Sequence, residues 1–113
     1  MNKGDYMYTL EEIKDKIAPI AKAHNLKAVY VIGSYARNEA REDSDIDLLY
    51  DKEGSDITTL VKASSLYADI KELFTVGVDL VDVKALQNPA NRQTSFIFIR
   101  NVERDRVKIY DRV

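Results

Sequence analysis

Two aspartates alternate with apolar residues in the stretch that runs from Asp45 to Leu48, and their type and spacing are suited to chemistry. A β-strand has a side-chain period of two, so Asp45 and Asp47 are expected on one face, with the apolar residues facing the core. Two carboxylates on one face repel each other and resist burial, and a shared cation would keep both ionised. Mg²⁺ prefers such oxygen ligands and often binds one or two carboxylates together with phosphates.

A possible anion-binding turn stands just upstream, where the apolar run ending in Val31 and Ile32 stops at Gly33-Ser34. A strand that ends in a Gly-Ser turn and opens a helix presents backbone N–H groups to an anion. We therefore expect a phosphate at this turn and a metal at the aspartates. The alternative interpretation is a surface turn followed by a strand that carries two solvated aspartates.

The combined pattern resembles a known family signature. Gly33-Ser34, Arg37 and the run from Ser44 to Leu48 are similar in type and spacing to the nucleotidyltransferase superfamily that includes DNA polymerase beta. The short chain most resembles the minimal nucleotidyltransferases, or MNT group, which often serve as antitoxin partners of HEPN toxins. The resemblance implies an α/β fold, a mixed β-sheet flanked by helices as in the polymerase-beta-like palm. Only the block from Gly33 to Asp47 is specific, and beyond it the similarity is one of element order.

Transfer chemistry that uses two metal ions needs more oxygen ligands than two aspartates provide. The expected strand 78–83 offers Asp79 and Asp82, whose spacing places them on opposite faces, so only one can join the first pair. In the minimal family the third acid stands early in a Val-Asp-Leu-Val strand, and Val78-Asp79-Leu80-Val81 matches it. The resemblance therefore favours Asp79, and Asp82 is expected to be a solvated residue at the strand end. Alternatively, both are exposed edge charges.

The resemblance also implies a reaction and a role for each residue. The expected activity is Mg²⁺-dependent nucleotidyl transfer at a two-metal site, with ATP as the donor of AMP. The expected catalytic and metal-binding residues are Asp45, Asp47 and Asp79, and the expected nucleotide-binding residues are Gly33, Ser34, Arg37 and Ser44. For Arg37 the residues leave two interpretations equally open, a phosphate contact or a surface ion pair with Glu39, Glu42 or Asp43.

Length and composition limit the function classes. The 113 residues are expected to form one domain, 1–113, with no room for a separate substrate domain. The net charge of −2 argues against a basic surface for a nucleic-acid backbone, so no stable nucleic-acid partner is expected.

Absence of cysteine excludes disulfides, thiolate chemistry and Cys-based zinc sites. No apolar run is long enough for a membrane span or signal peptide, so no membrane partner is expected and the expected location is the cytoplasm.

Three functions fit these observations. The first is an enzyme that moves AMP onto a tyrosine or similar hydroxyl of a partner, a helical HEPN-type toxin. The second is an enzyme that modifies a small molecule such as an aminoglycoside. The third is a non-enzymatic module that neutralises a toxin by contact, which the intact set of acids argues against.

The apolar periodicity predicts alternating helices and strands. The expected helices are 10–24, 34–39, 57–74 and 92–103, and the expected strands are 27–32, 45–51, 78–83 and 106–111. Thr9 is expected to cap the first helix, with Glu12 completing a capping box, and Ser55 or Asp56 is expected to cap the third. Residues 85–88 are expected to form a turn. The only histidine, His24, is expected to interact with the dipole at the end of the first helix.

Overall fold

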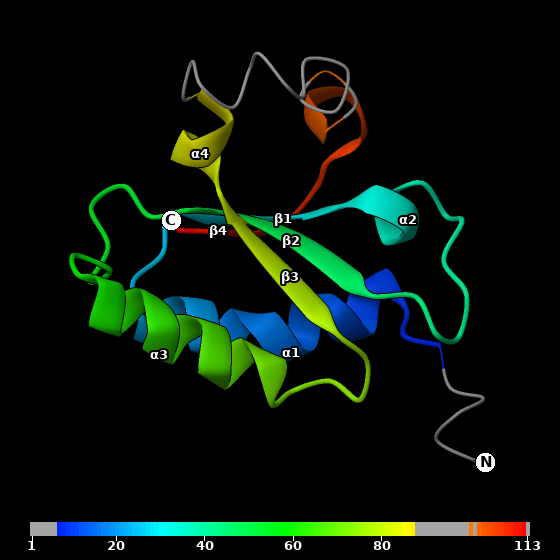
Figure 1. Ribbon diagram of the computed structural model, residues 1–113, viewed down its shortest axis with the longest axis horizontal. Helices are drawn as coiled ribbons and strands as arrows, with labels where there is room; N and C mark the ends of the chain where they lie inside the picture. The colour runs from blue at the N-terminus through cyan, green and yellow to red at the C-terminus, as the bar shows by residue number, and fades with distance from the viewer. Residues whose placement is uncertain (1–6, 88–99, 101, 113) are drawn as a thin grey trace.

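A four-stranded mixed β-sheet forms the centre of the fold in the computed structural model (Figure 1), which describes residues 7–87, 100 and 102–112. The strands are β1 (Ala28–Ile32), β2 (Ile46–Asp51), β3 (Val78–Asp82) and β4 (Val107–Asp111). Their order in the sheet is β3-β2-β1-β4, with β1 antiparallel to both β2 and β4, and β2 parallel to β3. The expected mixed sheet is confirmed.

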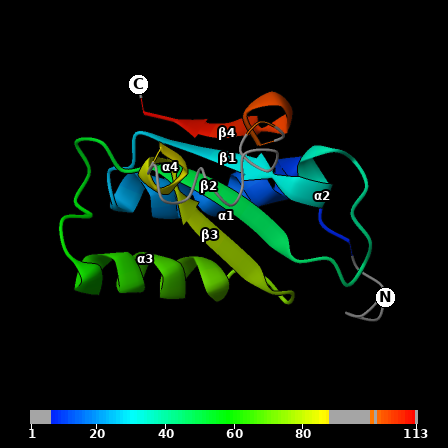
Figure 2. The same cartoon turned by 45° about the horizontal axis from the view of Figure 1, so that its top comes forward.

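Helices lie on both faces of this sheet. They are α1 (Leu10–Ala23), α2 (Gly33–Ala36), α3 (Leu60–Lys71) and α4 (Val83–Gln87), with a further helical turn at residues 102–105. In Figures 1 and 2, α1 and α3 cover one face, whereas α4 and the turn at 102–105 lie on the other. None of the helices in the described part of the chain combines the length and apolar character needed to cross a membrane.

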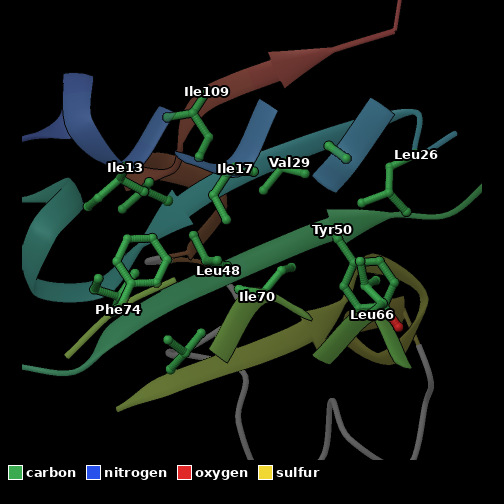
Figure 3. Packing of buried hydrophobic residues seen from close by; sticks show 14 of the residues in the cluster. Ile13, Ile17, Leu26, Val29, Leu48, Tyr50, Leu66, Ile70, Phe74 and Ile109 are labelled. Carbon is green, nitrogen blue, oxygen red and sulfur yellow. The ribbon is translucent and has the colours of Figure 1, made fainter. Parts of the chain in front are cut away.

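The two faces of the sheet bury separate hydrophobic clusters. The larger cluster joins Ile17 of α1 and Ile70 of α3 to Leu48 of β2, and Figure 3 shows these side chains packed together over the face of the sheet. On the opposite face, Leu49 of β2 packs with Val102. Since β2 is covered on both faces, its apolar residues are nearly continuous, and its polar positions fall where the sheet opens to solvent.

Local signals account for the start and end of α1. The hydroxyl of Thr9 accepts from the backbone N–H of Glu12, and the Glu12 side chain accepts from the backbone N–H of Thr9, so the expected capping box is confirmed. The helix ends at Ala23, one residue before the predicted end, with His24 as its C-cap. The His24 side chain contacts Asp69 of α3 with Nε2 3.0 Å from Oδ2, so it joins two helices in addition to lying at a helix end.

Two predicted elements are corrected here, and a third lies mostly outside the described residues. α3 begins at Leu60 because Thr59, not Ser55 or Asp56, caps it, with its hydroxyl accepting from the backbone N–H of Lys62. Residues 83–87 are helical, where a turn at 85–88 was expected, and the Asp82 carboxylate accepts from the backbone N–H of Lys84 in the first turn. Most of the predicted helix 92–103 lies outside the described residues, and its described residues 100, 102 and 103 are helical.

Candidate active site

The parallel pairing of β2 and β3 brings two of the predicted acids side by side. Asp47 and Asp79 are directly paired residues in the register of the two strands. Both lie on the face of the sheet that also carries Leu49 and Val81. A pocket of about 400 Å³ opens there, and we call it the carboxylate pocket. Its lining residues are Ile32, Gly33, Asp47, Asp79, Leu80 and Val81.

The electrostatics of this pocket act most strongly on Asp47. Partial burial, the hydrogen-bonding contact with Asp79 and the negative charges of Asp79 and Asp45 together raise the pKa of Asp47 from 3.8 to about 6. The positive charge of Arg37 partly opposes this rise in the pKa of Asp47. An ionised Asp47 is therefore unfavourable in the isolated chain, and a ligand that brings positive charge would relieve this cost.

Asp45 stands one residue before β2, close enough for its negative charge to act on Asp47. It is exposed, and its carboxylate lies directly against the Cα of Gly77, just before β3. A Cβ at residue 77 would lie 2.6 Å from the Asp45 Oδ1, so any larger residue would displace this carboxylate. The close approach of Gly77 to Asp45 was not predicted from the sequence. A glycine directly before the strand that carries the third acid was the available signal.

The predicted phosphate-binding turn lies against Asp47. Gly33 adopts a φ of +71° at the junction of β1 and α2, a conformation that side-chain-bearing residues rarely adopt. Its Cα faces the Asp47 side chain so closely that a Cβ would collide with the carboxylate. The N–H groups of the first turn of α2 have no partner within the helix. The backbone of Gly33 and Ser34 therefore stands next to the paired carboxylates.

Arg37 and Ser44 lie in the segment between α2 and β2. Arg37 Nε donates to Glu39 Oε2 at 3.2 Å, one of the ion pairs expected from the sequence, and both side chains are largely exposed. The Ser44 hydroxyl accepts from the backbone N–H of Arg41 at 2.8 Å and so closes the turn before Asp45. In the structure Ser44 helps to shape the loop, and its role in nucleotide binding stays a prediction.

Asp82 is directed away from the carboxylate pocket. It lies three residues after Asp79, and its Oδ2 is 3.1 Å from the Lys52 ammonium. It was expected to be solvated at the strand end, but this carboxylate is partly buried and pairs with both Lys52 and the backbone of α4. The alternation of β3 therefore separates the two aspartates, Asp79 beside Asp47 and Asp82 in a structural contact.

Asp47 and Asp79 are the acids that decide whether a divalent cation fits the carboxylate pocket. Within the described residues, no group of three or more His, Cys, Asp or Glu side chains is arranged to hold a metal ion. Asp47 and Asp79 alone give two oxygen-bearing side chains, and Mg²⁺ commonly takes one or two carboxylates and completes its shell with water and substrate phosphates. The raised pKa of Asp47 shows that its ionised form is disfavoured, so a cation bound beside it would stabilise that form.

Comparisons with known proteins agree with the observed architecture. The family described as "Polymerase beta, Nucleotidyltransferase" matches residues 15–112 of this chain. The Methanocaldococcus jannaschii protein MJ0435 is 38% identical over 78 residues, which are 68% of this chain and 81% of that protein. The protein adenylyltransferase MntA of Thermococcus cleftensis is 36% identical over 86 residues, which are 73% of this chain and 85% of that protein.

Solved structures share the same fold. The crystal structure of a toxin-antitoxin with AMP-PNP is similar with a TM-score of 0.61 and 22% identity, over 88% of this chain and 73% of that chain. A mutant of the toxin-antitoxin MntA-HpeT gives a TM-score of 0.58 and 20% identity, with the same coverage. The predicted polymerase-beta-like arrangement, a mixed sheet flanked by helices, is therefore confirmed.

Proposed function

Because the chain belongs to the polymerase beta nucleotidyltransferase family, we propose that it moves AMP from ATP to a hydroxyl group of a partner protein, as the antitoxin of a toxin-antitoxin pair. The proposed partner is a helical HEPN-type toxin, and the proposed cofactor is Mg²⁺. Residues 1–113 would act as one catalytic domain.

Two kinds of relatives support this proposal. The Thermococcus cleftensis relative is named a protein adenylyltransferase, and the aligned part covers 85% of its length. A structural neighbour is a toxin-antitoxin that was crystallised with the ATP analogue AMP-PNP. The shared fold and the names of these proteins together favour adenylyl transfer to a protein over modification of a small molecule.

The observation that carries the proposal is the pairing of Asp47 with Asp79 next to the Gly33 turn. Two carboxylates and the backbone of Gly33, which come from three elements, line one pocket, and this arrangement is suited to transfer of a phosphate-linked group. A site of this kind works mainly by positioning and charge stabilisation.

Each residue has a role in the proposed reaction. The backbone N–H groups of Gly33 and Ser34 would hold the β- and γ-phosphates, and Arg37 would exchange Glu39 for a phosphate oxygen. Asp79 would accept the proton of the acceptor hydroxyl. The hydroxyl oxygen then forms a bond to the α-phosphorus, the bond from that phosphorus to the bridging oxygen breaks, and pyrophosphate leaves with the bonding electrons.

Asp47 and Asp79 are the residues that would hold Mg²⁺ at the pocket, and Asp45, which the described structure does not group with them, is proposed to join them as a third ligand when the ion is bound. When bound, Mg²⁺ neutralises phosphate charge and makes the acceptor hydroxyl more acidic. The contribution of the chain is to keep Asp47 and Asp79 in register through the ladder between β2 and β3. The room left by Gly77 accommodates the Asp45 carboxylate.

Intact-mass spectrometry tests the proposal directly. The chain is mixed with the partner toxin, ATP and Mg²⁺, and the partner should gain the mass of one or more AMP groups. The Asp47→Asn variant should abolish this gain, and the Asp82→Asn variant should retain most of it. Absence of any mass gain on the partner, with efficient modification of an aminoglycoside instead, would contradict the proposal.

A further inference from the structure

The outer edge of β3 has unpaired hydrogen-bonding groups. β2 pairs with one side of β3, and within the described residues no strand pairs with the other side. The Gly77 carbonyl accepts from the Ile46 N–H of β2, so the alternation of the strand turns the N–H and C=O groups of Val78 and Leu80 outward. Val78 is only 4% exposed, whereas Leu80 is partly exposed, so the accessible part of this edge lies at Leu80. An accessible strand edge is a template for a further strand.

Two hollows lie on opposite sides of this edge. On one side of the sheet is the carboxylate pocket that holds Asp47 and Asp79. On the other side, a groove of about 310 Å³ lies between β3 and α3, and we call it the edge groove. The edge groove is lined by Tyr50, Leu60, Ala63, Ser64, Tyr67 and Leu80. Leu80 borders both hollows, so the two are separated only by the edge strand itself.

We propose that the acceptor segment of the partner protein binds as a fifth strand along the outer edge of β3. Side chains of an added strand alternate between the two faces of the sheet, as they do in β3. A hydroxyl residue would then reach Asp79, and an apolar residue an odd number of positions away would enter the edge groove. The inference rests on the proposed function and specifies how the acceptor is recognised.

The composition of the edge groove supports an extended, acidic segment as its occupant. Leu60 is 86% exposed and so contributes little to the folded core, although it lines the groove. The Lys71 ammonium lies 5.7 Å from the centre of the Tyr67 ring and adds positive charge to the same wall. The groove is therefore suited to an apolar side chain flanked by an acidic residue, and only the strand β3 separates it from the pocket where the acceptor hydroxyl must lie.

Synthetic peptides test the alternation. Octapeptides contain one tyrosine, one leucine, and glutamate and glutamine elsewhere, with the leucine either three or two positions from the tyrosine. The spacing of three places the two side chains on opposite faces of the added strand, whereas the spacing of two places them on the same face. With ATP and Mg²⁺, we expect AMP transfer to be about tenfold more efficient for the peptide with the spacing of three. Only this peptide can place its leucine in the edge groove while its tyrosine lies at Asp79, and burial of one leucine side chain is sufficient for a gain of about tenfold.

Variants on α3 provide a matched control. Leu60→Glu places a negative charge in the edge groove, and we expect it to remove the preference for the spacing of three and to slow transfer to the toxin about tenfold. Val61→Glu introduces the same charge at the next position, where the side chain is 79% exposed and does not line the groove. This control should behave like the unmodified chain. Both positions are exposed, so neither substitution disturbs the core.

A binding measurement distinguishes failure of docking from failure of the proposed function. Addition of the spacing-three peptide to isotope-labelled chain should shift the amide signals of Val78 and Leu80 more than those of Asp79 and Val81. Unshifted Val78 and Leu80 signals, equal transfer to both peptides, or equal effects of Leu60→Glu and Val61→Glu would each overturn the docking site. Absence of AMP transfer to toxin and peptides alike would contradict the proposed function, whereas shifted Val78 and Leu80 signals would still support docking.

Discussion

Replacement of Asp47 by asparagine should stabilise the metal-free chain at neutral pH. The ionised carboxylate is partly buried beside Asp79 and close to Asp45, and these surroundings raise its pKa to about 6. Asparagine has nearly the same shape, carries no charge and can donate a hydrogen bond to the Asp79 carboxylate. The substitution therefore removes charge repulsion and desolvation cost without leaving a cavity.

The pH dependence of this gain has a definite sign. Below pH 3.8, Asp47 is protonated in both the folded and unfolded chains, so ionisation contributes no difference in stability. Between pH 3.8 and about 6 the folded state binds more protons than the unfolded state, so stability falls as the pH rises. Above this window the folded wild-type chain bears the full cost, and the advantage of Asp47→Asn should be greatest.

The size of the gain follows from the shift of the Asp47 pKa. A rise of roughly two pKa units corresponds to an upper limit of about 3 kcal/mol in the free energy of unfolding. Because the side chain is partly exposed, solvent screening reduces the expected gain to about 1–2 kcal/mol. For a domain of this size, such a gain raises the melting temperature by about 4–10 °C.

Thermal unfolding in a metal chelator, at pH 7.5 and at pH 3.5, measures the effect. Asp82→Asn is the matched control, because it also replaces a carboxylate by an amide. Unlike Asp47, Asp82 forms an ion pair with Lys52, and the substitution removes that pair. It should leave the melting temperature at pH 7.5 unchanged or slightly lower. A melting temperature of Asp47→Asn equal to or below that of the wild-type chain at pH 7.5, or a gain that persists at pH 3.5, would refute the reasoning.

Three further predictions follow from the same geometry. Gly33→Ala should lower the free energy of unfolding by about 1–3 kcal/mol, because of its positive φ and the nearby Asp47 carboxylate, and should weaken nucleotide binding; denaturation and titration with a non-hydrolysable ATP analogue measure both. Asp79→Asn should slow AMP transfer at least about a hundredfold in a mass-spectrometric time course, and a similar loss in Asp82→Asn would show that the wrong aspartate was chosen. Ile70→Ala should cost about 2–5 kcal/mol of stability in urea denaturation, because Ile70 is fully buried between α3 and the sheet, and a loss below about 1 kcal/mol would contradict that packing.

Much of the secondary structure could be predicted because local signals determine it. The reciprocal hydrogen bonds of Thr9 and Glu12 involve residues three positions apart, so the start of α1 was evident from the sequence. The start of α3 was less evident, since Ser55, Asp56 and Thr59 all have side chains that can cap a helix. The choice of Thr59 depends on where α3 packs against the core, which no short stretch of sequence encodes.

The alternation of Asp45 and Asp47 and the turn at Gly33 were likewise visible in the sequence, because they follow from strand periodicity and backbone conformation. Their electrostatic consequence was not visible. It depends on the parallel register that pairs Asp47 with Asp79, more than thirty positions later, and on the space at Gly77. The opposite faces of Asp79 and Asp82 were predicted from the strand period, but the ion pair that Asp82 forms with Lys52, a residue outside β3, was not visible in the sequence.

The sequence by itself therefore determined the local elements and the two motifs whose members lie within one strand or turn. The tertiary structure alone decided which distant residues share a pocket and how strongly their charges interact. The physical reason is that periodicity fixes the face of a strand on which a side chain lies, whereas pairing between strands fixes its neighbours. The pKa of Asp47 and the open edge of β3 both result from that pairing.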